Sequence, residues 1–414
     1  MKSIIIVGGG AAGMLAAIFA ARGGARVTLL ERNEKLGKKV YITGKGRCNL
    51  TNTAQGEDFL RQVVRNPRFL YAAMSNFDSA DMMALMESLG VPVKVERGNR
   101  VFPESDHASD VTAGLRREME RLGVEIRYDS RVSGLIAEDG RIAGVTLEGG
   151  ERCHADAVIL ATGGASYPST GSTGDGWTFA EAVGHSVVPP MPALVPIRTK
   201  ESWPGTLAGL SLKNVALRAW KAGKKRRYFY DEMGEMLFTH SGISGPIALS
   251  LSSRLPEDLT EVHMEIDLKP ALDAQTLDTR LLRDFKEFSR KQITHVMDGL
   301  APHSLGQQIL LLAGISPQLP VNSVTQAQRA KLVELLKGLP LTPAGLHGFE
   351  EAIVTRGGVS VKEINPSTME SKIVRGLYFA GEMIDVDAMT GGFNLQIAFS
   401  TGALAGKSAA EEEA

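Results

Sequence analysis

The chain has 414 residues, of which 43% are hydrophobic and 22% charged, and its formal net charge is −1. This composition is ordinary for a soluble globular protein with two or three domains, and the near-zero charge excludes a global attraction to nucleic acid or anionic lipid. Its two cysteines, Cys48 and Cys153, lack the spacing of a disulfide scaffold, a zinc site or a dithiol pair. We therefore expect a cytoplasmic protein without a metal site.

The N-terminal stretch predicts a dinucleotide-binding turn. Residues 4–7 form a β-branched run typical of a strand buried on both faces, and a small-residue helix is expected over 11–21. Between and within them, Gly8, Gly10 and Gly13 follow the G-x-G-x-x-G spacing. Such glycines permit a tight turn, a close approach to a pyrophosphate and close packing of helix on strand. The helix N-terminus would then hold the phosphates.

The acid that follows the second strand supports this interpretation. A strand is expected over 25–30 and ends at Glu31, where an acid commonly hydrogen-bonds a ribose hydroxyl. An acid there also repels a 2′-phosphate, which favours an adenosine ribose with free hydroxyls over NADP. The uncharged run 3–21 could suggest a signal peptide or a membrane span, but its three consecutive glycines and the immediate second strand argue against both.

A basic, glycine-rich loop covers residues 35–52. Its cations and backbone amides suit contact with the cofactor, and a solvated basic loop is the alternative. Within it, Cys48 lies between Arg47 and Asn49, where a cation could lower the pKa of the thiol. A small buried filler is the alternative interpretation of this cysteine.

The middle of the first domain alternates between helices and strands. Helices are expected over 59–89 and 106–122, strands over 91–102 and 124–132, and an antiparallel hairpin over 134–147. A buried strand at 157–161 runs into a glycine pair, and a second glycine-rich turn at 170–177 opens another helix. Glycines at the end of a parallel strand suit a ligand site, although both segments could be plain turns.

A group of prolines between 189 and 196 predicts a domain boundary, and the chain beyond it alternates as strands to about residue 237. Helices are expected over 278–314 and 324–337, with a return to strand near 348–355. The strand-like part carries a run of cations beside three aromatic residues. These cations could contact phosphates while the aromatics stack on bases, as in RNA binding, or they could lie on a solvated hairpin whose aromatics are core residues. The cations are Lys221, Lys224, Lys225, Arg226 and Arg227.

The C-terminal region returns to the nucleotide. An apolar strand at 376–380 ends on an acid, Glu382, and the segment 390–402 is a glycine turn that opens a helix. In flavoproteins such a late strand closes the sheet, and the helix N-terminus stabilises negative charge on the reduced flavin ring. This return distinguishes an FAD fold from a simple NAD dehydrogenase.

Six stretches together resemble the BaiN/RdsA-like family of NAD(P)/FAD-dependent oxidoreductases. The resemblance spans nearly the whole chain and includes TGKGRCNLTN and FTHSGISGP, which are specific to this group. It implies an α/β fold with a Rossmann-like, three-layer FAD-binding domain built from both termini, at 1–192 and 352–414. It also implies an insert domain at 193–351, with a β-barrel-like part at 193–238 and 321–351 and a mainly helical part at 239–320.

The same resemblance implies non-covalent FAD and a reductase of activated C=C bonds, with a small enone or a uridine of 23S rRNA as the candidate substrate. An aminoacetone-type amine oxidase and a non-catalytic, ribosome-associated flavin binder are the alternatives. No second G-x-G-x-x-G follows a strand, so NAD(P)H is expected to act as a transient reductant. The substrate, the choice of nicotinamide and the oligomeric state stay open.

Two residues are predicted to be catalytic: His240 as a polar group near the substrate, and Cys48 as a proton donor. The residues predicted to contact the cofactor come from every glycine-rich segment named above. They are Gly8, Gly10, Ala11, Ala12, Gly13, Glu31, Arg32, Lys38, Lys39, Thr43, Gly44, Gly46, Arg47, Cys48, Asn49, Val132, Ala161, Thr162, Gly163, Gly164, Asp175, Gly381, Glu382, Gly391, Gly392, Asn394 and Leu395.

Overall fold

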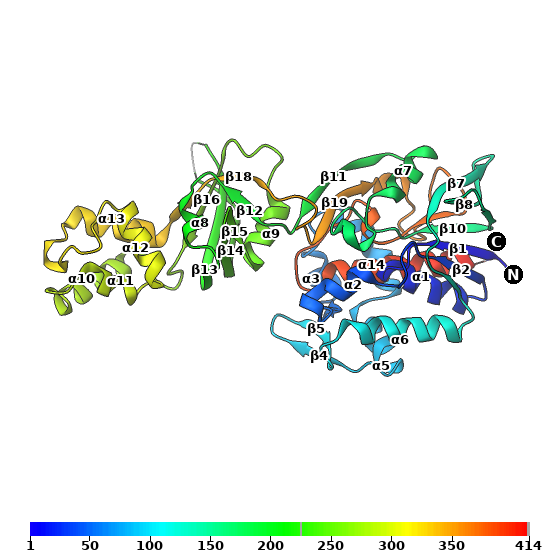
Figure 1. Ribbon diagram of the computed structural model, residues 1–414, viewed down its shortest axis with the longest axis horizontal. Coiled ribbons are helices and arrows are strands. Elements are labelled where there is room, and N and C mark those ends of the chain that lie inside the picture. Colours follow the sequence, from blue (N-terminus) through cyan, green and yellow to red (C-terminus); the bar gives the residue numbers. More distant parts are fainter. Residues whose placement is uncertain (224–225, 412–414) are drawn as a thin grey trace. The chain divides into compact units, whose positions relative to one another are not determined.

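The computed structural model describes residues 1–223 and 226–411 (Figure 1). The chain divides into two compact units: unit 1 comprises Met1–Ala193 and Gly348–Ala414, and unit 2 comprises Leu194–His347. The two ends of the described chain lie close together in unit 1: the Lys2 ammonium donates to the backbone carbonyl of Ala409 at 3.4 Å. Two cations of the predicted basic run, Lys224 and Lys225, lie outside the described residues.

A five-stranded parallel sheet forms the centre of unit 1, in the order β20-β10-β1-β2-β6. Strands β1 and β10 consist of apolar residues over almost their whole length because helices and loops cover both faces of the sheet. The late strand β20 pairs with β10 in parallel, so the sheet built from both termini is confirmed. The strands are β1 (Ser3–Val7), β2 (Arg26–Leu30), β6 (Glu125–Arg127), β10 (Ala157–Leu160) and β20 (Leu377–Phe379).

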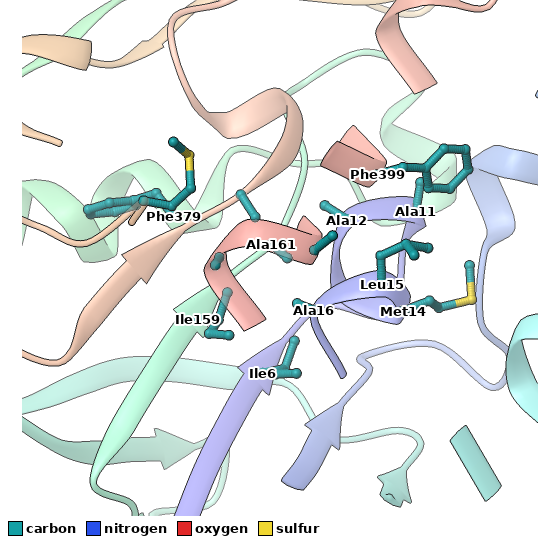
Figure 2. Packing of buried hydrophobic residues seen from close by; sticks show 14 of the residues in the cluster. Ile6, Ala11, Ala12, Met14, Leu15, Ala16, Ile159, Ala161, Phe379 and Phe399 are labelled. Carbon is teal, nitrogen blue, oxygen red and sulfur yellow. The ribbon is translucent and has the colours of Figure 1, made fainter. Parts of the chain in front are cut away.

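Two helices of small residues pack on this sheet, α1 (Ala11–Arg22) and α14 (Phe393–Ala410). A Cβ atom added to Gly402 or Gly406 of α14 would lie 2.2 Å from a carbonyl oxygen of α1. The two backbones therefore approach more closely than any larger residue allows. Figure 2 shows the adjoining core, where Ala12 and Ala16 of α1 lie beside apolar side chains of β1 and β10. This packing holds the N-terminal ends of both helices near the same edge of the sheet.

Smaller sheets complete unit 1. The predicted antiparallel layer is a three-stranded meander of β7 (Val132–Glu138), β8 (Arg141–Leu147) and β9 (Arg152–His154), with its first turn at Asp139-Gly140. A second small sheet contains β3 (Thr51–Asn52), β4 (Val93–Glu96) and β5 (Arg100–Pro103), and β11 (Val187–Ala193) pairs with β19 (Val354–Val359). The remaining helices include α2 (Lys38–Ile42), α3 (Gly56–Leu60), α4 (Tyr71–Asn76), α5 (Ser79–Ser88), α6 (Ala108–Arg121) and α7 (Asp175–Ala182).

Unit 2 is built on a seven-stranded antiparallel sheet in the order β17-β16-β13-β14-β15-β12-β18. Its two edge strands, β17 (Leu339–Leu341) and β18 (Pro343–Leu346), are joined by the single residue Thr342. The sheet must therefore curl until its edges lie close together, which gives the expected barrel-like shape. The other strands are β12 (Ile197–Thr199), β13 (Ser211–Lys221), β14 (Tyr228–Thr239), β15 (Gly242–Ser244) and β16 (Val262–Asp267).

The predicted division of this unit into a β-rich and a helical part is wrong in two places. Strands β15 and β16 fall inside the segment predicted to be helical, and α13 (Gln326–Lys337) falls inside the segment predicted to be β-rich. The apolar residues of β16, Val262, Met264 and Ile266, alternate with polar ones and belong to the core of unit 2, so the strand carries a period-2 signal that the prediction missed. On its other face, Glu265 and Asp267 are buried in ion pairs. The other helices of the unit are α8 (Trp203–Thr206), α9 (Pro246–Arg254), α10 (Ala274–Glu287), α11 (Ile293–Asp298) and α12 (His303–Leu312).

Figure 1 shows α10 to α13 gathered at one end of unit 2. Within the described residues, no helix combines the length and the apolar character that crossing a membrane requires.

Candidate cofactor site

Four predicted segments meet at one edge of the parallel sheet. Gly8 follows β1, Glu31 follows β2, Ala161 follows β10 and Gly381 lies just beyond β20. Because these strands are parallel and neighbouring, their carboxyl ends lie side by side. Ligands of open α/β sheets bind in the crevice outside the carboxyl ends of the strands. The structure therefore brings the N-terminal and C-terminal motifs to one place.

The glycine turn after β1 has the geometry of a phosphate cradle. Gly8 has φ +103°, and a Cβ there would lie 2.6 Å from the Ala161 carbonyl oxygen. A Cβ on Gly13 would lie 1.9 Å from the carbonyl oxygen of Gly8. The helix can therefore pack this closely against the turn only if residue 13 is glycine. A Cβ on Gly10, in contrast, would meet no atom within 4 Å. Helix α1 thus begins beside open space, at an N-terminus that no side chain caps.

Glu31 is held beside this turn by three hydrogen bonds. Its Oε2 accepts from the backbone N–H of Gly9 at 2.7 Å, and its Oε1 accepts from the backbone and side-chain amides of Asn33 at 2.8 and 2.6 Å. A carboxylate has about four acceptor positions, so capacity for a ribose hydroxyl remains. The role of Asn33 in holding Glu31 was not predicted, although its position only two residues after the acid allows this local contact.

A second carboxylate, Glu382, meets the predicted cation Lys39. The Lys39 ammonium lies 2.5 Å from Glu382 Oε2 and donates to Ser166 at 2.6 Å. Glu382 Oε1 accepts from the Ser166 hydroxyl at 2.7 Å and from the backbone N–H of Thr355 at 2.8 Å. Lys39 and Glu382 are therefore brought together as predicted members of one site. Ser166 and Thr355 were not predicted, because their partner is far away in the sequence.

Asp175, the first residue of α7, is the centre of a small ion cluster. It lies 3.1 Å from Arg32 and 3.0 Å from Arg131, and Thr173 donates to it at 2.7 Å. Burial raises the pKa of Asp175, but the hydrogen bonds from Thr173 and Arg131 and the charge of Arg32 outweigh burial, and the net shift is downward. Val132, the next residue after Arg131, begins β7 at this cluster.

The turn before α14 is fixed by the small sheet of unit 1. Gly391 and Gly392 have φ +124° and +98°, and a Cβ on Gly392 would lie 2.2 Å from the carbonyl oxygen of Thr51. The Asn52 side chain donates to the Gly391 carbonyl at 3.0 Å. The loop 35–52 and the C-terminal glycine turn are therefore neighbours. The sequence did not single out Thr51 or Asn52 for this role.

The side chain of Asn394 has a structural partner. Its Oδ1 accepts from the backbone N–H of Ala388 at 2.9 Å, and its Nδ2 donates to the Ala388 carbonyl at 2.8 Å. The side chain therefore clamps the loop that precedes α14. Asn394 and Leu395 could therefore contact the cofactor through their backbone amides, in the first turn of α14.

Several predicted cofactor contacts are engaged within the protein instead. Lys38 pairs with Glu34 at 2.7 Å. Arg47 pairs with Glu96 and, at 2.6 Å, with Asp106, and these hydrogen bonds raise its pKa. Thr43, Gly44 and Gly46 form a short 3-10 turn, in which the Thr43 hydroxyl donates to the Val40 carbonyl. Of this loop, the Asn49 Oδ1 is buried without a hydrogen-bond partner among the described residues.

The two predicted substrate-side groups have different surroundings. Cys48 is 0% exposed, and burial raises the pKa of its thiol to about 12. The expected lowering of this pKa is therefore wrong, because Arg47 is turned to its carboxylate partners, and the interpretation as a buried filler holds. His240 is exposed in the turn between β14 and β15 of unit 2.

The basic run of unit 2 is partly neutralised. Arg226 pairs with Glu265 at 2.8 Å, and its guanidinium carbon lies 4.0 Å from the ring centroid of Trp220. Lys221 and Arg227 are exposed. Fewer cations are therefore available for RNA in the described part of this hairpin than the sequence suggests.

The fold and the site define a Rossmann-type, dinucleotide-binding oxidoreductase. The family model described as "HI0933-like protein Rossmann domain" matches residues 2–408. The chain is 35% identical to a Clostridium scindens protein named 3-dehydro-bile acid delta(4,6)-reductase, over 99% of this chain and 100% of that protein. It is 32% identical to the ribosomal RNA dihydrouridine synthase of Haemophilus influenzae, over 96% of each chain.

Among solved structures, a 3-ketosteroid delta1-dehydrogenase from Sterolibacterium denitrificans has the same fold, with a TM-score of 0.51 at 14% identity. The match covers 99% of this chain and 100% of that one. The chain belongs to the HI0933-like Rossmann family and is an FAD-dependent oxidoreductase.

Proposed function

We propose that this protein uses a reduced nicotinamide to saturate a C=C bond conjugated to a carbonyl group. The supporting observation is that two full-length relatives bear names for the same bond change on different molecules, a bile-acid derivative and a uridine of ribosomal RNA. A conjugated carbonyl makes one alkene carbon electrophilic, so the bond can accept a hydride there and a proton at the neighbouring carbon. The bond change is therefore the shared property, and the molecule that carries it is the variable one.

Two features of unit 1 fit FAD. The open space at Gly10 suits a pyrophosphate beside the N-terminus of α1, and the unpartnered Oδ1 of Asn49 suits a ligand N–H donor. In this proposal Glu31 accepts from a ribose hydroxyl, and the N-terminus of α14 offers its positive end to the flavin pyrimidine. When bound, FAD supplies two-electron hydride transfer. The protein supplies the fixed cradle, the helix dipole and shielding from water.

For an rRNA substrate, the basic hairpin of unit 2 is the surface that would contact the RNA. Lys221, Arg226 and Arg227 are all exposed in the described part of the basic hairpin, but Arg226 is paired with Glu265 and stacked on Trp220. Lysine and arginine side chains that are not already held in an ion pair within the protein are available to neutralise phosphates. In the rRNA version of this proposal, Lys221 and Arg227 contact the RNA backbone.

The test reduces the purified FAD-bound protein anaerobically with NADH or NADPH and then adds one of two acceptors, a steroid enone or unmodified 23S rRNA. Reoxidation of the flavin with formation of the saturated steroid, or of dihydrouridine detected by nucleoside mass spectrometry, supports the proposal. Reduction by an amine with peroxide formation in oxygen, and no reaction with either alkene, would overturn it. FAD binding without any turnover would instead indicate a non-catalytic flavin binder.

A charge-reversal pair distinguishes the two acceptors. The double variant Lys221→Glu, Arg227→Glu should lower activity on rRNA about 10-fold or more and leave activity on the enone unchanged. The matched control is Lys286→Glu, Arg290→Glu, which makes the same charge change at exposed positions in and just beyond α10. Equal loss in both double variants would assign the effect to net charge and not to the hairpin.

A further inference from the structure

One buried carboxyl group in unit 1 has no hydrogen-bond partner. Asp387 is 1% exposed, and neither of its side-chain oxygens has a partner among the described residues. Leaving a buried polar group unpaired costs about 1–3 kcal/mol, and more if the group is charged. Such a group needs either a proton, a partner supplied by a ligand, or both. Asp387 lies between Glu382 and the Gly391-Gly392 turn in the sequence.

The backbone around Asp387 is held rigidly. Its carbonyl oxygen accepts from the N–H of Val64 at 2.8 Å, and the N–H of Met389 donates to the Gln62 carbonyl at 2.9 Å. On the other side, the N–H of Asp385 donates to the Val359 carbonyl at 3.0 Å. The Asn394 side chain clamps Ala388 as described above. The backbone on both sides of Asp387 is therefore fixed by hydrogen bonds to other segments of unit 1.

The charges around Asp387 suit a group that gives up a proton. Burial raises its pKa to about 7, the guanidinium groups of Arg356 on β19 and Arg65 before η2 (Pro67–Leu70) oppose this shift, and Asp385 adds to it. Burial thus keeps the acid protonated, while the two arginines stabilise the carboxylate that remains after proton loss. General acids work best when their pKa lies near the working pH.

The neighbouring Asp385 shows what a partnered aspartate looks like in the same loop. It lies 3.0 Å from Arg65 Nε and accepts from Arg65 Nη2 at 3.1 Å. It also accepts from the Asn66 side chain at 3.2 Å. Asp385 and Asp387 therefore differ in their partners, although they share one loop and nearly the same burial. Of the two arginines whose charges act on Asp387, Arg65 is paired with Asp385.

We propose that Asp387 is the proton donor for the C=C bond that this protein reduces. The inference rests on the proposed function. Two electrons arrive with a hydride, derived from the reduced nicotinamide, at the electrophilic alkene carbon, and a new C–H bond forms there. The O–H bond of Asp387 breaks, its proton forms the second C–H bond at the neighbouring carbon, and the carboxylate left behind is reprotonated from water. The product is the saturated carbonyl compound.

Three variants test this role in the FAD-bound protein. Asp387→Asn keeps the shape but cannot donate, Asp387→Glu keeps the acid, and Asp385→Asn changes the partnered neighbour. Anaerobic stopped-flow measurements separate flavin reduction by NAD(P)H, which needs no proton from the protein, from reoxidation by the steroid enone or the rRNA. We expect Asp387→Asn to slow reoxidation at least about 100-fold while reduction changes less than about 3-fold. Asp387→Glu should restore part of the rate.

The pH dependence of the reoxidation rate separates a proton donor from a residue with a purely structural role, because only a donor gives this rate an inflection at its own pKa. Wild-type reoxidation should decline as pH rises through about 7, and Asp387→Asn should remove this inflection. Asp385→Asn removes a negative charge that raises the pKa of Asp387, so it should move the inflection to lower pH. An unchanged inflection in Asp387→Asn would overturn the proposal.

Infrared difference spectra between acidic and basic pH supply a readout independent of turnover. The wild-type protein should lose a protonated carboxyl C=O band as pH rises through about 7, and Asp387→Asn should lack that band. Absence of the band in the wild type, or equal slowing of both half-reactions in Asp387→Asn, would refute the donor role. If the wild-type protein itself is reoxidised by neither acceptor, the proposed function fails, and this outcome is recognisable because it does not depend on any variant.

Discussion

The carboxyl edge of the sheet in unit 1 and the sheet of unit 2 are both rich in charged residues, but these residues differ in what they contact. In unit 2, Asp267 pairs with Lys337 at 2.7 Å, and Glu265 pairs with Arg226 at 2.8 Å. In unit 1, the space at Gly10 is empty of protein atoms, and Asp387 has no hydrogen-bond partner among the described residues. A buried charge with an ion-pair partner indicates a structural role, whereas a buried acid with neither an ion pair nor a hydrogen bond is a candidate for contact with a ligand.

The largest expected effect comes from two glycines of one motif. Gly13→Val should prevent folding of unit 1, because its Cβ would lie 1.9 Å from the Gly8 carbonyl oxygen. Gly10→Val should leave the fold intact, since its Cβ meets no protein atom within 4 Å, and should weaken FAD binding at least about 100-fold. Circular dichroism and flavin titration measure the two properties. A Gly10→Val protein that binds FAD normally would show that the open space is not the cradle.

Two buried aspartates provide the next comparison. The pKa of Asp387 is raised from 3.8 to about 7, so the folded state holds more protons than the unfolded state between these values. Its contribution to stability is complete below about pH 4 and is lost as pH rises through about 7, a difference of about 4 kcal/mol. Asp387→Asn should therefore flatten the dependence of the unfolding free energy on pH, measured by urea denaturation.

Asp267→Asn is the contrasting variant, because it breaks a buried ion pair with Lys337. It should destabilise the protein by about 3 kcal/mol, since the fully buried carboxylate that faces both Lys337 and Arg218 is lost. The pH dependence assigned to Asp387 should persist in this variant. Equal pH profiles for Asp267→Asn and Asp387→Asn would contradict the distinction between the two groups.

Adjacent lysines of α2 give a smaller effect. Lys39→Met removes an ion pair with Glu382, in which both side chains are about one-fifth exposed, and should cost about 1–2 kcal/mol in chemical denaturation. Lys38→Met removes a pair with Glu34, whose side chain is 63% exposed, and should cost clearly less than Lys39→Met because solvent screens this pair. If both variants lose a similar amount of unfolding free energy, Glu382 is more exposed to solvent than the structure indicates.

The smallest effect concerns the basic hairpin. Arg226→Gln should lower the unfolding free energy by about 1 kcal/mol, because it loses Glu265 and the Trp220 ring. Arg227→Gln should leave stability unchanged, since Arg227 is exposed. If neither variant changes stability, Arg226 counts with Arg227 as a cation that is free to contact RNA.

Local patterns predicted a large part of unit 1. The spacing of the glycines, the β-branched strand before them and the acid at Glu31 all act within about thirty residues, so their structural consequences can be derived from neighbouring residues. The prediction failed where polar residues are buried by distant partners. Arg47 was predicted to contact the cofactor because its partners, Glu96 and Asp106, lie far along the chain. The alternation of apolar and polar residues in β16, in contrast, is a local signal that the prediction missed.

The sequence by itself determined the glycine turns, the parallel strands that carry them and the return of the C-terminus to the nucleotide, because backbone freedom and strand burial are local properties of residue type. Only the tertiary structure decided which charges are paired. Lys39 and Glu382 are 343 residues apart in the chain, and Arg65, whose charge also acts on Asp387, is paired with Asp385. A carboxyl group keeps or loses its proton according to burial and to the charges facing it, and both depend on which distant segments pack together.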